Sequence, residues 1–148
     1  MAATNENFRK FCEASLTAGG ASPSQIANAE SSLGVVFPKS YRAFLEEFGA
    51  MIADGFEVFG IVEIEKNSPP MWQQVVDVTS QLRRLGQVGT ERRHLVPISE
   101  DGLGAYFFLN TNCSGNGEVL AIGPGVDEVI AQDLESFAVR MNSGDMQY

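Results

Sequence analysis

The 148-residue chain has little of what catalytic, metal-binding and disulfide-stabilised proteins depend on. It contains one histidine and two cysteines. Cys12 and Cys113 do not belong to a CxxC motif, which argues against a disulfide framework, a zinc site and a redox centre. Basic residues are also scarce, with 10 lysines and arginines against 19 acids, a net charge of −9. Because phosphate binding needs clustered cations, nucleic acid is a poor direct partner for this chain.

Long hydrophobic runs are absent as well. No segment of 18 consecutive apolar residues occurs, and the first residues, MAATNENFRK, contain no apolar run. We therefore expect neither a membrane span nor a secretory signal, and we place the protein in the cytoplasm. In that compartment the sequon at Asn112 is most simply a polar turn.

The overall composition is that of a globular protein. Hydrophobic residues make up 44% of the chain and charged residues 20%, both close to the averages for folded domains. A chain of this length buries enough surface to fold without covalent cross-links. We expect one domain over residues 1–148.

The strongest local pattern is SPSQIANAESSLGVVFPKSYRAFLEEFG, residues 22–49, which predicts two helices. Ser22 and Gln25 form a capping box, Pro23 suits the first turn, and Gly34 ends the first helix. The second helix begins at Pro38 and ends at Gly49. Apolar residues recur with helical spacing in both segments at Ile26, Ala29, Leu33, Tyr41, Phe44, Leu45 and Phe48.

Shorter signals predict the remaining elements. A helix is expected over residues 4–16, one or two strands over 56–62, a helix from Ser68 up to Gly86, and a last helix capped by Asp133. Four apolar runs separated by glycine-rich turns predict an antiparallel meander over residues 95–98, 104–109, 118–122 and 128–131. The expected class is α+β, mainly an antiparallel sheet flanked by N-terminal helices, a middle helix and a C-terminal helix.

Few residues suggest chemistry. His94 has no second ligand at metal-binding spacing and lies next to arginines, which would repel a cation. The glycine clusters lack phosphate-loop spacing, and neither a GxSxG nor an SxxK motif occurs. Adjacent acids at residues 46–47, 100–101 and 127–128 are more typical of solvated turns and helix faces than of a catalytic dyad. We predict no catalytic residue, no cofactor and no metal site.

Charge is unevenly distributed along the chain. From Leu95 to Tyr148 there are eight acids and one arginine, whereas residues 83–93 carry four arginines and one glutamate. An acidic surface attracts basic macromolecules and accelerates their encounter. A basic protein is therefore the expected partner.

The two-helix stretch resembles the signature of the SUKH superfamily. The matching positions are Ile26, Glu30, Leu33-Gly34, Pro38, Tyr41, Phe44-Leu45 and Gly49. Weaker matches continue through Phe59-Gly60-Ile61, Val96-Pro97, Asp101-Gly102, Gly104 with the aromatic strand to Asn110, and Phe137. The resemblance is strongest over residues 22–62 and extends weakly to residue 141. This chain departs from the usual pattern at Phe48, Ala105 and Asn110, so its partner or binding face differs if those positions contact partners in relatives.

The resemblance implies a non-enzymatic protein-binding domain. Many bacterial members are immunity proteins of polymorphic toxin systems, and the fungal member regulates cell-wall synthesis. The leading hypothesis is an immunity protein that neutralises a cognate toxin, such as a basic nuclease. A regulatory scaffold that binds an endogenous protein is the alternative, and a small enzyme is a third reading that the sparse inventory of candidate site residues disfavours. The sequence does not predict an oligomeric state.

Partner-binding residues are predicted mainly from charge and position. The acidic turns are the first choice, Asp54 and Glu57 the second, and Trp72 is added because tryptophan is enriched at interfaces. The full set is Glu100, Asp101, Asp127, Glu128, Asp54, Glu57 and Trp72. The alternative for the acids is an ordinary solubilising surface, and the alternative for Trp72 is internal packing.

Overall fold

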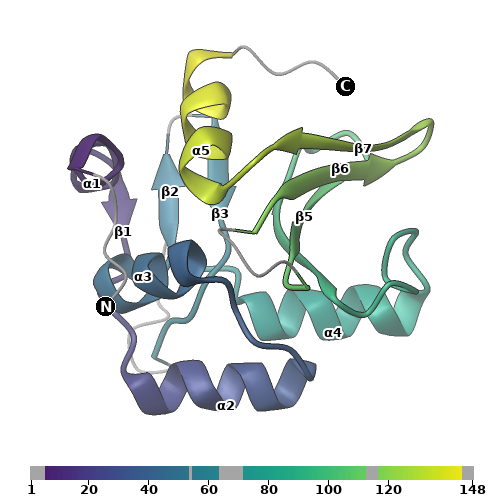
Figure 1. The fold of residues 1–148 in the computed structure, drawn as a ribbon, viewed down its shortest axis with the longest axis horizontal. Helices are drawn as coiled ribbons and strands as arrows, with labels where there is room; N and C mark the ends of the chain where they lie inside the picture. Colours follow the sequence, from purple (N-terminus) through teal and green to yellow (C-terminus); the bar gives the residue numbers. More distant parts are fainter. Residues whose placement is uncertain (1–5, 54, 64–71, 113–116, 145–148) are drawn as a thin grey trace.

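A computed structural model describes residues 6–53, 55–63, 72–112 and 117–144. Its helices are α1 (Glu6–Glu13), α2 (Pro23–Leu33), α3 (Lys39–Phe48), α4 (Val75–Leu85) and α5 (Leu134–Ser143). Its strands are β1 (Leu16–Thr17), β2 (Met51–Ala53), β3 (Phe56–Val58), β4 (Leu95–Glu100), β5 (Tyr106–Asn110), β6 (Val119–Gly123) and β7 (Val126–Ala131). The fold is α+β, as predicted (Figure 1).

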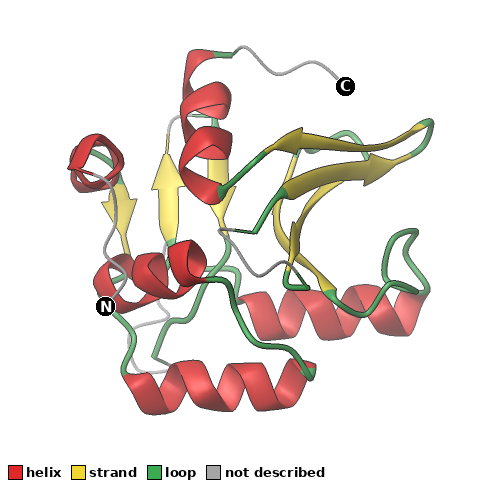
Figure 2. Cartoon of the chain, viewed as in Figure 1, coloured by secondary structure: helices red, strands yellow, loops and turns green. Residues whose placement is uncertain are grey.

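Two antiparallel sheets meet near the middle of the molecule. One has the order β1-β2-β3 and the other β4-β5-β6-β7. The N–H of Phe59, just after β3, donates to the carbonyl of Ile98 on β4 over 2.7 Å and so joins the two sheets. In Figure 2, α5 lies above this junction and α2, α3 and α4 lie below it. The second sheet is the predicted meander.

Several predicted boundaries are wrong. The first helix ends at Glu13, and Leu16 belongs to β1 instead. Strand β2 was not predicted at all. The helix expected from Ser68 begins at Val75, because residues 72–74 are non-helical and Gln74 forms a parallel bridge with Gly60. Residues 68–71 lie outside the described part of the chain.

The signature helices are held by local polar contacts. The capping box is confirmed, with the Gln25 N–H donating to the Ser22 hydroxyl and the Ser22 N–H donating to the Gln25 side chain. Further on, one carboxylate oxygen of Glu30 accepts from the Phe37 N–H and from the Arg42 guanidinium, both over 2.7 Å. Glu30 therefore fixes the turn between α2 and α3.

Helix α3 is attached to β3 by a buried hydrogen bond and by a close backbone contact. The fully buried Tyr41 hydroxyl donates to the Phe59 carbonyl over 2.6 Å. Gly49, after the end of α3, packs so closely on the backbones of Gly19 and Gly60 that an added Cβ on Gly49 or Gly60 would collide with a neighbouring carbonyl. The Ile61 N–H donates to the Gly49 carbonyl over 2.9 Å at the same place.

One large apolar core connects the two sheets. Phe137 on α5 contacts Phe56 on β3, with ring centroids 6.3 Å apart, and Phe107 on β5, with centroids 5.1 Å apart. A second, smaller cluster on the opposite face of the four-stranded sheet contains Phe108 and Ile122. The backbone at Gly89 lies against both of these side chains, so the loop between α4 and β4 covers this face.

The close contact at Gly49 predicts an unusually large effect of adding one methyl group. Gly34 and Gly49 both follow a helix and have φ near 73 and 75°, but nothing lies within 4 Å of an added Cβ at Gly34. Gly34→Ala should cost about 1–2 kcal/mol of unfolding free energy, from the left-handed conformation alone. Gly49→Ala should cost about 3 kcal/mol or more, because Gly49 has ψ −61°, outside the left-handed helical region, and the added Cβ would also collide with the Gly19 carbonyl.

Urea unfolding of the two variants beside the wild type measures both costs. Equal costs for Gly34→Ala and Gly49→Ala would contradict the described packing.

Candidate protein-binding site

The predicted acids that the structure describes gather at one end of the four-stranded sheet. Glu100 on β4 pairs with Tyr106 on β5, Tyr106 with Ile122 on β6, and Ile122 with Asp127 on β7. These four residues thus form one row across the sheet, and adjacent strands are about 4.8 Å apart, so the row spans roughly 14 Å. Glu57, on β3 of the other sheet, is close to Glu100, because the hydroxyl of the neighbouring Ser99 donates to the Glu57 carbonyl and the charge of Glu100 acts on Glu57.

We call this region the acidic end and define it as Glu57, Glu100, Asp101, Asp127 and Glu128, with Leu103 and Tyr106 between them.

Glu57 is a partly buried carboxylate of the acidic end. Burial raises its pKa, and the nearby charge of Glu100 raises it further, although a hydrogen bond accepted from the Gln73 N–H over 3.2 Å opposes the shift. The backbone is also fixed, because the buried Ser99 hydroxyl donates to the Glu57 carbonyl over 2.5 Å. Burial and Glu100 likewise raise the pKa of Tyr106. These groups are thus partly stripped of water before any partner binds.

Asp101 builds the turn between β4 and β5. Its carboxylate accepts from the Leu103 N–H over 2.7 Å and from the Ala105 N–H over 3.1 Å. The turn holds Leu103 with 87% of its surface exposed. The β6–β7 turn lies next to it, since Gly104 packs near Pro124. The contribution of Asp101 is therefore mainly to shape the site.

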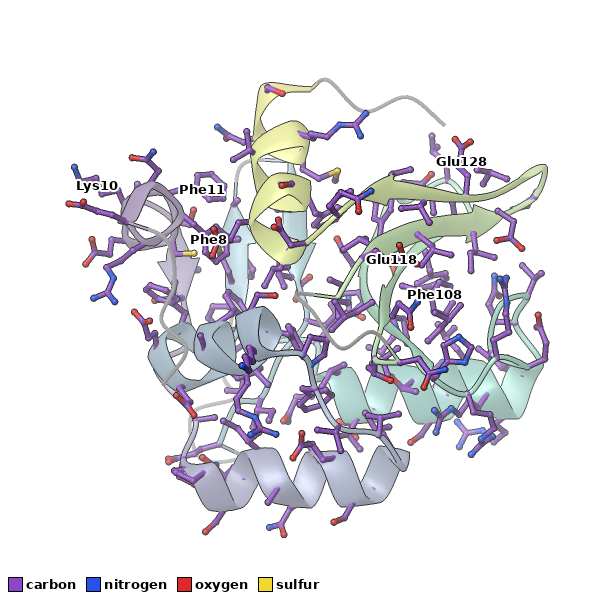
Figure 3. The ribbon with its side chains drawn as sticks, in the orientation of Figure 1. Phe8, Lys10, Phe11, Phe108, Glu118 and Glu128 are labelled. Carbon is purple, nitrogen blue, oxygen red and sulfur yellow. The ribbon has the colours of Figure 1, made fainter. Side chains whose placement is uncertain are left out.

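The two acids on β7 face opposite sides of the sheet. Asp127 accepts from the Arg92 guanidinium over 2.7 Å, so part of its charge is compensated from the loop before β4. Glu128 is exposed and lies on the other side of the sheet from Phe108, as Figure 3 shows. Glu128 is thus more available to a partner than Asp127.

The acidic end as defined does not include two of the predicted site residues, Trp72 and Asp54. Trp72 is only 9% exposed and packs with Ala50 and Val62, which leaves it little surface for a partner. Asp54 lies outside the described residues. Leu103 was not predicted as a site residue, although a leucine between two glycines in a polar turn is a recognisable signal of an exposed apolar side chain.

The arginine-rich segment is used largely within the fold. Arg83 donates to the carbonyls of Leu33 and Arg93, and burial lowers its pKa. His94 and Arg93 line a shallow hollow of about 620 Å³ beside α2, together with Glu30, which is already bonded to Phe37 and Arg42. Among the described residues, no cluster of three or more histidine, cysteine or acidic side chains could hold a metal ion.

These features define an α+β fold with an acidic end held by hydrogen bonds, and the comparisons with known proteins give its family. A family model described as SUKH_6, SMI1-KNR4 cell-wall, matches residues 23–137, so the chain belongs to this family. A crystal structure of a protein from Pseudomonas syringae pv. tomato has the same fold, with a TM-score of 0.68 and 20% sequence identity over 90% of this chain and 94% of that chain. No curated protein matches significantly.

Family membership supports a protein-interaction or immunity-type domain in general. The signature residues have structural roles here, because Glu30 and Tyr41 make the contacts that join α2, α3 and β3. Within the described ranges, no helix has both the length and the hydrophobicity needed to cross a bilayer.

The raised pKa of Glu57 predicts a pH-dependent stability difference. A carboxyl whose pKa is higher in the folded state than its ordinary value of 4.5 stabilises the fold when protonated, and this contribution is lost as the pH rises through the folded pKa. Glu57→Gln cannot lose a proton there. The variant should therefore gain stability relative to the wild type between pH 4 and pH 7, measured by denaturant unfolding.

The Glu100→Gln background is the control for this prediction. Because Glu100 contributes to the raised pKa of Glu57, the gain on adding Glu57→Gln should be smaller there. A gain that falls as the pH rises would contradict the assignment.

Proposed function

We propose that this chain is an immunity protein, folded as a single domain over residues 1–148, that binds a cognate toxin in the cytoplasm and neutralises it. The observation that carries the proposal is the acidic end, in which the partly desolvated Glu57 lies among other acids and the backbone is held by hydrogen bonds with Ser99 and Asp101. The family membership supports protein binding of this kind. The toxin class that best suits the charge is a basic nuclease, whose phosphate-binding surface would accept the carboxylates in place of its substrate.

Rigidity of the acidic end favours tight binding. A surface that is already ordered loses little conformational entropy when a partner docks. Here Glu57 is fixed through Ser99 and Gln73, and Asp101 holds its own turn. Leu103 supplies an exposed apolar side chain among the acids, which suits a partner whose basic surface contains a small apolar pocket.

A regulatory scaffold is the second candidate function. It is favoured by the description of the matching family model, which refers to the cell wall. A scaffold would also bind protein without catalysis, so the identity of the partner separates the two functions. Purification of this chain together with the product of the adjacent gene distinguishes the two functions. If that product is a toxin and this chain abolishes its activity, the chain is an immunity protein. If the chain instead forms a stable complex with a cellular protein and inhibits no toxin, it is a scaffold.

Charge steering predicts that association with a basic partner depends strongly on salt. The association rate constant should fall by about tenfold or more between low and physiological ionic strength, because exposed charges are screened. The double variant Glu57→Gln/Glu100→Gln should slow association more than Glu13→Gln/Glu46→Gln. The second pair makes the same change in net charge at exposed positions on α1 and α3.

Stopped-flow mixing with the captured toxin measures these rates. Equal rates for the two double variants, or a rate that does not change with salt, would contradict binding at the acidic end.

A further inference from the structure

Strand β7 is an open edge of the four-stranded sheet. It pairs with β6 on one side, and no other described strand pairs with its outer side. Asp127, Glu128 and Val129 are all exposed, although successive residues of a strand point to opposite faces. Neither face of the sheet is therefore covered at this part of β7, where the β6–β7 hairpin extends past α5 (Figure 1).

The hairpin geometry indicates which backbone groups are available. The two-residue turn at Pro124 and Gly125 closes on the pair Gly123 and Val126. In an antiparallel ladder, hydrogen-bonded and non-hydrogen-bonded pairs alternate from such a closing pair. The N–H and C=O groups of Asp127 and Val129 thus point away from β6. Further along, the Ile130 carbonyl accepts from the Arg140 guanidinium, which closes the edge there.

The charges on β7 select what can pair with this edge. Arg92 compensates Asp127, whereas no described cation is within ion-pair distance of Glu128. Antiparallel pairing of two copies through β7 would bring their carboxylates together, and like charges opposite one another destabilise a sheet. A strand with a basic residue beside Glu128 and an apolar residue beside Val129 would be matched on both faces.

We propose that the edge of β7 from Asp127 to Val129 binds an extended segment of the partner protein by adding it as a fifth strand to the sheet. The inference rests on the proposed function, because its ligand is a basic segment of that partner. Main-chain hydrogen bonds to Asp127 and Val129 hold the segment, and a lysine or arginine opposite Glu128 selects it. The acidic end thereby gains a backbone-directed contact in addition to its charge.

The direct probe is a five-residue peptide with the sequence TVKVT. Added to the wild-type protein, it should slow the amide hydrogen exchange of Asp127 and Val129, measured by NMR. A peptide with glutamate in place of lysine should bind at least about fivefold more weakly. Protection centred outside β7, or equal binding of the two peptides, would overturn the proposal.

Three variants test the proposal with the partner protein. Val129→Pro removes an outward N–H and Glu128→Lys reverses the selecting charge, so each should weaken partner binding about tenfold, while Glu46→Lys, with the same charge reversal on α3, should weaken it less. Circular dichroism checks that Val129→Pro remains folded, and the exchange experiment on the wild type does not depend on it. A toxin that is still neutralised with unchanged affinity by Val129→Pro and Glu128→Lys overturns the edge-strand proposal and leaves the proposed function standing. Peptide binding at β7 without any captured toxin counts against the proposed function instead.

Discussion

The close packing of Gly49 on the backbones of Gly19 and Gly60 is the constraint on which the rest of the structure depends. It places the end of α3 directly against the chain that follows β3. Tyr41 adds a buried hydrogen bond to the Phe59 carbonyl, and the Phe59 N–H then bonds to Ile98 on β4. Phe59, which directly follows β3, thus connects the signature helices to both sheets. The position of Glu57 relative to Glu100 follows from this connection.

The same connection explains how the signature residues help to position the acidic end, to which they do not belong. Neither Glu30 nor Tyr41 belongs to the acidic end, and both are engaged in internal hydrogen bonds. Glu30 fixes the turn before α3, and Tyr41 bonds α3 to Phe59, the residue whose N–H joins the chain after β3 to β4. They thereby help to hold two carboxylates from different sheets close together. Two like charges held in this way repel each other, and in the proposed complex a cation of the partner between them would relieve that repulsion.

Much of the fold could be predicted because its signals are local. The capping box at Ser22, the glycines that end helices and the turns of the meander each depend on a few neighbouring residues. Strand β2 was missed because Met51–Ala53 is too short to show a period, and its pairing with β1 and β3 decides its conformation. The helix expected from Ser68 was misplaced because Gln74 pairs with Gly60, a distant residue.

The acids of the acidic end could be identified from the sequence, but their contacts could not. Counting charges identified the acids at residues 100–101 and 127–128, and the register of the sheet brings them to one end. The pairing of Asp127 with Arg92 could not be read from the sequence, because it joins residues 35 positions apart. Trp72 was chosen for its residue type alone, and residue type does not indicate burial.

The central claim is that a rigid frame presents the acidic end to a basic partner protein. Hydrogen exchange measured by mass spectrometry on the complex with the captured partner tests this claim most directly. The account predicts new protection in residues 99–106 and 126–129 on complex formation, and unchanged exchange in the signature helices α2 and α3. Protection concentrated on α2 and α3, with the acidic end unchanged, would contradict it.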